Sequence, residues 1–216
     1  MKQLIKGTEP ASFTHWKNTA NAEWTPTYAT LQNPLKRDLH DSLLTEQNFS
    51  CCYCSREVGL ADSHIEHFRP QSLYPPLALD YQNLHASCIR ETTPDTPLHC
   101  GHLKDNWFDE ALYISPMEDG CELRFRYLFS GEIQTSKHED LAATKMIAVL
   151  ALDIAYLNNR RNQVIQRVFD NDFLSEASNE DLRKMAAGYR AVETDPQVPF
   201  SHVIARYAEQ LLATNP

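Results

Sequence analysis

The clearest helical pattern in the chain runs over residues 33–47. Its apolar side chains repeat every four residues, at Leu35, Leu39 and Leu43, as the buried face of a helix does. Asn33 can cap this helix, and Pro34 suits its first position. We therefore expect a helix here whose leucines enter a core, and a shorter helix near residues 12–18.

The second half of the chain is predicted to be mostly helical. Apolar side chains keep to one helical face from residue 139 to about residue 169, so we expect one long helix there. A further helix should start at Ser178, because Ser178 and Asp181 can form a capping box. A last helix should start at Ser201, and Pro196 and Pro199 separate the two.

The segments of this chain that show a strand-like pattern are short. Residues 122–129 alternate between apolar and polar side chains, and Gly131 and Ile133 follow, which predicts a β-hairpin. Between residues 54 and 80 the helical period is absent and prolines interrupt any helix. There we expect two short strands, around Tyr53 and Ile65, joined by a turn near Gly59. Residues 91–98 read as a polar loop, and a helix can begin just after Gly101.

These elements predict an α+β protein in three parts. Residues 1–50 form an N-terminal loop and helix, residues 51–110 a central unit, and residues 111–216 a β-hairpin followed by helices. A hydrophobic content of 42% and a charged content of 23% are ordinary for a soluble protein. The first residues show no apolar stretch, and the most apolar run, residues 146–157, is too short to span a bilayer. We therefore expect a cytoplasmic protein that does not bind or span a membrane and has no disulfides.

The net charge of −9 argues against a protein that coats nucleic acid, since such proteins need a broad basic surface. It does not exclude a nuclease, which needs only a local basic track. The charge therefore leaves an enzyme that acts on nucleic acid open.

Metal-seeking side chains concentrate between residues 51 and 107, which hold five of the six cysteines and five of the nine histidines. Cys51 and Cys54 have the spacing of a zinc knuckle, and Cys88 and Cys100 are candidates for a second pair. Cys52 can replace Cys51, and His99 or His102 can replace Cys100. The alternative is a set of buried free thiols. We interpret the four cysteines as a structural zinc site, and Cys121 as a core thiol outside it.

A second constellation has the parts of a phosphodiesterase. His67 can deprotonate water, because histidine titrates near neutrality, and Glu66 can hold a divalent cation. Asn83 can orient the imidazole, and His102 can supply a second metal ligand. The alternatives are a histidine without chemistry and a turn asparagine. A zinc protease is rejected, because His64 and His67 are three residues apart rather than four and Pro70 follows at once.

Together these motifs resemble the HNH (ββα-metal) endonuclease signature. The matching positions, in order, are Cys51 and Cys54, Glu66-His67-Phe68-Arg69-Pro70, Asn83-Leu84, Cys88 and Cys100, then His102 and Lys104. More narrowly, the segment from His64 to Pro70 together with Cys100-Gly101-His102-x-Lys104 resembles the PtuB-type HNH proteins of Septu and retron-associated anti-phage systems. Weaker likenesses, such as Lys6-Gly7-x-x-Pro10, extend this resemblance over roughly the whole chain.

The resemblance implies a zinc-stapled ββα-metal core between an N-terminal helix and a mostly helical C-terminal half. It makes His67 the general base, Asn83 the central asparagine, and Glu66 the ligand of a catalytic Mg²⁺ or Mn²⁺. His102 would be the last ligand, although the usual position is occupied by Gly101, so Asp105 and Asn106 stay open. His64 belongs to the narrower family, and we expect it to be a site residue.

The resemblance also implies partners: a PtuA-type ATPase and, in retrons, a reverse transcriptase with its RNA–DNA product. We thus expect an endonuclease that serves as the effector of an anti-phage complex. Two alternatives remain: a ribonuclease acting on structured RNA such as tRNA, because no residue reports on a 2′-hydroxyl, and a non-catalytic zinc module that docks a partner or nucleic acid.

Overall fold

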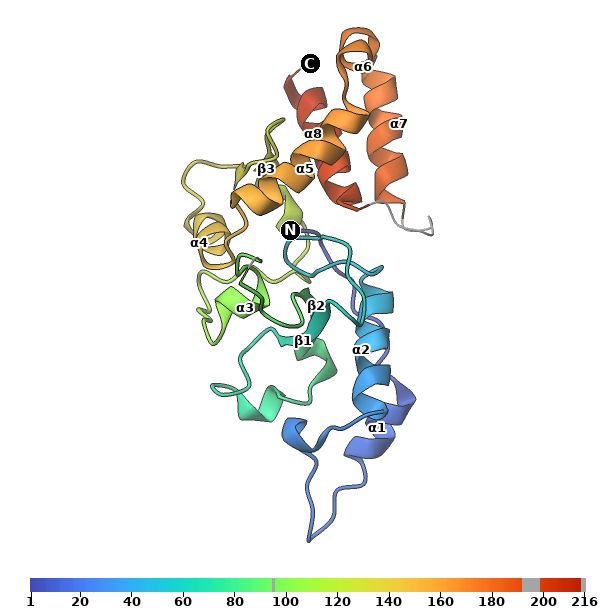
Figure 1. Cartoon of the computed structure of the whole chain (residues 1–216), viewed down its shortest axis with the longest axis vertical. Helices are drawn as coiled ribbons and strands as arrows, with labels where there is room; N and C mark the ends of the chain where they lie inside the picture. The colour runs from blue at the N-terminus through green and yellow to red at the C-terminus, as the bar shows by residue number, and fades with distance from the viewer. Residues whose placement is uncertain (95, 192–198, 215–216) are drawn as a thin grey trace.

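The N-terminal helices of the computed structural model lie beside a small central sheet (Figure 1). The structure describes residues 1–94, 96–191 and 199–214. Helix α1 (Ala11–Lys17) packs on α2 (Leu35–Glu46), and α2 packs on the second strand of the sheet. Both helices are confirmed, and Leu39 and Leu43 are fully buried. The predicted cap of α2 is wrong: Pro34 occupies the N-cap position, follows a cis bond from Asn33, and offers no side-chain hydrogen bond.

The central sheet consists of two antiparallel strands, β1 (Ser63–His67) and β2 (Leu84–Cys88). The partner of the strand around Ile65 is therefore β2, and the predicted strand around Tyr53 is wrong. Tyr53 lies in the turn that brings Cys51 and Cys54 together. The 3-10 turns η1 (Tyr28–Thr30), η2 (Pro75–Leu77) and η3 (Tyr81–Asn83) and the short helix α3 (Gly101–Lys104) complete this region.

The predicted hairpin exists but is shorter than its alternating pattern. Strand β3 (Phe125–Tyr127) pairs with β4 (Ile133–Thr135), and Gly131 turns the chain with a φ of +84°. Phe125 and Tyr127 are buried, as the alternation requires. The start of the pattern forms the 3-10 turn η4 (Cys121–Arg124) instead, which leaves Leu123 exposed.

The single long helix expected over residues 139–169 is wrong, because the chain breaks into α4 (Leu141–Val149) and α5 (Ala155–Val168). Where the helix breaks, the backbone carbonyl groups accept hydrogen bonds from polar groups of other segments. The amide of Cys100 donates to the carbonyl of Leu150 at 2.9 Å, and the buried guanidinium of Arg161 donates to the carbonyl of Leu152 at 2.7 Å. Tertiary hydrogen bonds thus replace the helical ones that the apolar pattern predicted.

The C-terminal helices form a separate cluster, at the top of Figure 1. Helix α7 (Asn179–Arg190) begins at the predicted capping box of Ser178 and Asp181, and α8 (Ser201–Thr214) begins as expected. Helix α6 (Asn171–Glu176) was not predicted. Helix α8 packs on α7, α5 and β3. Pro196 lies outside the described residues, and the three predicted parts remain a prediction.

One buried apolar cluster runs through the described residues, from the N-terminal segment to α8. The observed class is a mixed α and β architecture with two small sheets, as predicted at that level. Within the described residues, no helix has the length and apolar character needed to cross a membrane.

Candidate active site and metal centre

Four buried cysteines meet at the end of β2. The sulfur atoms of Cys51, Cys54, Cys88 and Cys100 all lie within 4.8 Å of one another, and those of Cys54 and Cys88 are 3.8 Å apart. Thiolates bound to a tetrahedral zinc ion at roughly 2.3 Å lie about 3.8 Å apart. The donor set and its spacing therefore fit a structural zinc ion, and of the alternatives left open, the structure brings together Cys51 rather than Cys52.

Neighbouring groups complete the cysteine cluster. The amide of Cys88 donates to the sulfur of Cys51 at 3.3 Å, and Nε2 of His99 lies 3.4 Å from the sulfur of Cys88. His99 therefore supports a ligand instead of replacing Cys100. Burial lowers the pKa of Arg56, but the neighbouring cysteines and Asp62 outweigh it and hold the pKa above its ordinary value. Such donors and cations offset the negative charge that four thiolates bring to a buried site.

Glu66 is a buried carboxylate, 6% exposed, that is held from three sides. Its Oε1 lies 2.9 Å from Nζ of Lys104 and accepts a hydrogen bond of 3.0 Å from the hydroxyl of Tyr53, while Oε2 lies 3.4 Å from Nε2 of His64. Burial raises the pKa of Glu66, but the contacts with His64 and Lys104 outweigh it and hold the pKa below its ordinary value. Glu66 is thus ionised, and Oε2 is its less occupied oxygen.

Gly101 explains why the usual ligand position carries no side chain. A Cβ atom at this position would lie 2.5 Å from Oε2 of Glu66 and 2.7 Å from Nε2 of His64, far inside van der Waals contact. The start of α3 therefore approaches the two side chains so closely that any larger residue would displace at least one of them. The position that was predicted to break the motif is a packing requirement of this site.

His67 has a fixed orientation and a depressed basicity. Its Nε2 lies 3.1 Å from the carbonyl of Ala78, and its ring packs edge-on against Tyr28, with centroids 4.5 Å apart. Because a carbonyl only accepts, Nε2 carries the hydrogen and Nδ1 keeps a lone pair. Burial lowers the pKa of His67 below its ordinary value, so the ring is neutral at pH 7 and can take a proton there.

Asn83 holds the loop beside His67 and makes no hydrogen bond to the ring. Its amide nitrogen donates to the carbonyls of Arg69 and Leu77, both at 3.0 Å, and its oxygen accepts from the amide of Arg69 at 2.7 Å. The residue after Leu77 is Ala78, whose carbonyl fixes His67. Asn83 therefore acts on the imidazole through the loop.

The second metal site is not assembled as a group of ligands. Among the described residues, the four cysteines are the only set of three or more potential ligands that converge. The ring of His102 lies beside that of His64, with centroids 4.7 Å apart, and its buried Nε2 has no hydrogen-bond partner. Asp105 and Asn106 line a cleft of about 200 Å³ together with Glu66 and His67. Asp105 and Asn106 thus share a cleft with Glu66, and His102 lies beside His64, which contacts Glu66.

Three contributors escaped the sequence analysis. Tyr53, inside the cysteine knuckle, links the metal cluster to Glu66, and Lys104, which is 2% exposed, pairs with the same carboxylate. Tyr28 covers His67 from a segment nearly forty residues away. Of the three, only Lys104 had a sequence signal, its place in the motif, and that signal did not indicate a buried ion pair with Glu66.

No model of a known protein family matches this chain. The chain is 28% identical over 141 residues to a protein of Vibrio cholerae serotype O1 biovar El Tor whose name is "Retron Vc95 putative HNH endonuclease". The matched stretch covers 62% of this chain and 66% of that protein, so the chain spans just under two thirds of the length of its relative. The chain thus combines a four-cysteine cluster and an adjacent Glu66–His67 pair with a distant likeness to a protein that bears the name of an HNH endonuclease.

Proposed function

We propose that this protein is a metal-dependent HNH endonuclease that hydrolyses phosphodiester bonds of nucleic acid. The observation that carries the proposal is the pairing of an ionised Glu66 with a neutral, oriented His67 on adjacent residues of β1. Strands β1 and β2 followed by α3, stapled by the cysteine cluster, would be the ββα-metal core. The name of the Vibrio cholerae relative supports the same class of enzyme.

In this mechanism His67 removes a proton from the attacking water through Nδ1. The hydrogen bond from Nε2 to Ala78 keeps Nδ1 unprotonated beforehand and stabilises the imidazolium afterwards. Asn83 keeps the loop that carries Ala78 in place. Tyr28 shields one edge of the ring, which helps to keep the base neutral.

The catalytic Mg²⁺ or Mn²⁺ would be held by Oε2 of Glu66 and by His102. An unpartnered buried nitrogen such as Nε2 of His102 is what an absent ligand leaves behind. The ion would stabilise the charge that develops on the leaving oxygen. Lys104 and Tyr53 would fix Glu66 through Oε1 and leave Oε2 free for the ion, and His64 would orient Oε2 or share the ion. The four cysteines would hold structural zinc.

The biological setting is also a proposal. The resemblance to PtuB-type proteins supports a role as the effector nuclease of an anti-phage complex with a PtuA-type ATPase. The name of the relative supports a retron setting, in which a reverse transcriptase and its RNA–DNA product would be further partners. Helix α8 and its neighbours are the largest part of the chain outside the candidate core.

The test is cleavage of labelled duplex DNA, single-stranded DNA and tRNA with Mg²⁺ or Mn²⁺, by the protein alone and together with its ATPase. His67→Ala should lower cleavage by at least about 100-fold, the usual contribution of a general base. His138→Ala removes an exposed histidine and is the matched control. Equal activity of the two variants would refute the role of His67. A wild-type protein that binds zinc but cuts none of the substrates would instead be a zinc module, and cleavage confined to tRNA would make it a ribonuclease.

A further inference from the structure

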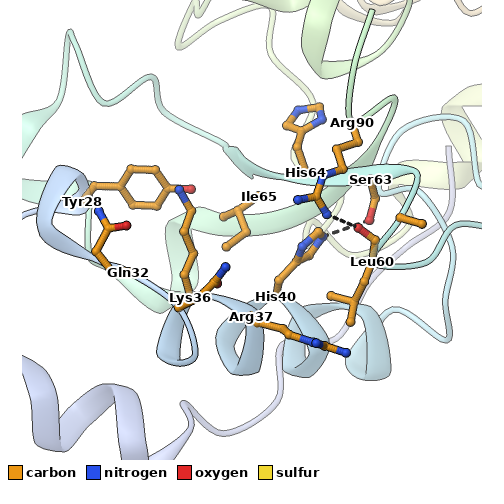
Figure 2. A pocket seen from close by; sticks show the side chains of 12 residues that line it. Tyr28, Gln32, Lys36, Arg37, His40, Leu60, Ser63, His64, Ile65 and Arg90 are labelled. Carbon is orange, nitrogen blue, oxygen red and sulfur yellow. Dashed lines mark hydrogen bonds between the residues drawn. The ribbon is translucent and has the colours of Figure 1, made fainter.

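A cationic pocket of about 650 Å³ lies between α2 and β1, next to the candidate active site (Figure 2). Its volume is in the range of roughly 300–1,000 Å³ that is typical of small-ligand pockets. Three cationic side chains line it: Lys36 and Arg37 from α2, and Arg90 from the segment after β2. None of the described residues that line it is acidic, although the chain as a whole carries a net charge of −9.

The charges of these three side chains are free to attract an anion. Lys36 places its ammonium 4.7 Å above the ring of Tyr28, Arg37 is exposed, and Nη1 of Arg90 donates to the carbonyl of Leu60 at 2.6 Å. Within the described part of the chain, none of the three forms an ion pair with a carboxylate. Arg124, by contrast, lies 2.6 Å from Asp140. Unpaired cations gathered around a hollow attract an anion more strongly than paired ones do.

The pocket adjoins the candidate active site. Ile65 lines both this pocket and the cleft that contains Glu66 and His67. Tyr28 also lines the pocket, and its ring packs edge-on against that of His67. In the view of Figure 2, Tyr28, Lys36 and Ile65 lie toward the left, and His40, His64 and Arg90 lie to their right. A chain of phosphates that entered between Arg37 and Arg90 would be led along β1 toward His67.

We propose that this pocket binds the phosphodiester backbone of the nucleic-acid strand adjacent to the bond that is cut. The proposal rests on the proposed function, and it assigns substrate binding to α2, which lies outside the motif that carries the chemistry. Lys36 and Arg37 supply the charge on one wall, and Arg90 supplies it on the other. An acidic protein would thereby gain the local basic track that a nuclease needs.

The experiment measures binding of a labelled oligonucleotide to protein that carries His67→Ala, so that cleavage cannot interfere. Adding Lys36→Gln and Arg37→Gln removes two phosphate contacts. At 0.1 M salt we expect the Kd to rise on the order of 20- to 60-fold, and the slope of log Kd against log salt to fall by about 1.4–1.8. The matched control adds Arg183→Gln and Lys184→Gln, which remove the same two charges from the exposed side of α7.

Each outcome decides a separate claim. If the α2 pair and the α7 pair weaken binding equally, the pocket is not the binding site. If a free mononucleotide binds to the pocket as tightly as the oligonucleotide does, the pocket takes a small phosphate compound and the strand assignment is wrong. If the wild-type protein fails to cut nucleic acid, yet only the α2 pair lowers binding and its salt slope, the proposed function fails and the binding site stands.

Discussion

Replacing Gly101 with alanine is the sharpest test of how the candidate active site is packed. The added Cβ atom would lie 2.5 Å from Oε2 of Glu66 and 2.7 Å from Nε2 of His64. An ordinary contact is roughly 3.5 Å, so the carboxylate must retreat by about 1 Å. Glu66 cannot yield freely, because it is buried and held at Oε1 by Lys104 and Tyr53.

The expected effect falls on activity more than on stability. A displacement of about 1 Å at a reacting centre costs roughly 100-fold in rate, and we expect Gly101→Ala to lower cleavage by about that factor. Overpacking at a buried site costs about 1–3 kcal/mol, and alanine returns up to about 1 kcal/mol as the better helix former. The free energy of unfolding should therefore fall by only about 1–2 kcal/mol.

The assay pairs single-turnover cleavage with urea unfolding and zinc analysis. Gly188→Ala is the matched control, because Gly188 also lies in a helix but has nothing within 4 Å of the added atom. It should keep full activity and unfold at the same or slightly higher urea concentration. A Gly101→Ala protein that cuts at the wild-type rate would refute the close approach of α3 to Glu66. Loss of zinc in that variant would show instead that the change disturbs the neighbouring Cys100.

Three further predictions concern the cysteine cluster, the buried ion pair of Lys104 and Glu66, and the buried histidine His40. Cys54→Ser should lose the zinc, about one ion per chain, and several kcal/mol of stability. Cys121→Ser changes an equally buried cysteine outside the cluster and should keep the zinc. Equal zinc contents of the two variants by elemental analysis would contradict the four-cysteine site. Lys104→Met should destabilise the fold by about 3–5 kcal/mol because it removes the buried ammonium that pairs with Glu66. Lys184→Met, which removes an exposed pair, should lower the free energy of urea unfolding by less than about 1 kcal/mol. Burial lowers the pKa of His40 to about 4, below the unfolded value of 6.5, so its stabilising contribution is present above pH 6.5 and is lost as the pH falls toward 4. Because of His40, the free energy of unfolding should thus drop by about 2 kcal/mol between pH 7 and pH 5. The His40→Gln variant should show a smaller drop. If the wild type and this variant lose stability in parallel as the pH falls, His40 is not buried in its neutral form.

The helices that were predicted correctly follow from short-range patterns in the sequence. Helices α2, α7 and α8 were found from apolar spacing and, for α7, from the capping box at Ser178, because these features act within a few residues. The break between α4 and α5 was missed, because it is stabilised by Cys100 and Arg161, which lie far from it in sequence or on the next helix. The strand expected at Tyr53 failed for a similar reason, since four cysteines shape that turn more strongly than strand propensity does.

The sequence by itself indicated which chemical groups are available in this protein. The knuckle spacing of Cys51 and Cys54, the neighbouring Glu66 and His67, and the order of the motifs point to candidate ligands and candidate reacting groups without any coordinates. Those are properties of residue types and short spacings, so they can be read along the chain.

The tertiary structure alone decided how these groups meet. It brought Cys88 and Cys100 to the knuckle, buried Lys104 against Glu66, and brought Gly101 into close approach with Glu66 and His64. It also set the cations of α2 beside His64 and Ile65, which no local pattern indicated. Contacts of this kind depend on which distant segments pack together, and packing is settled by the whole core rather than by any short stretch of sequence.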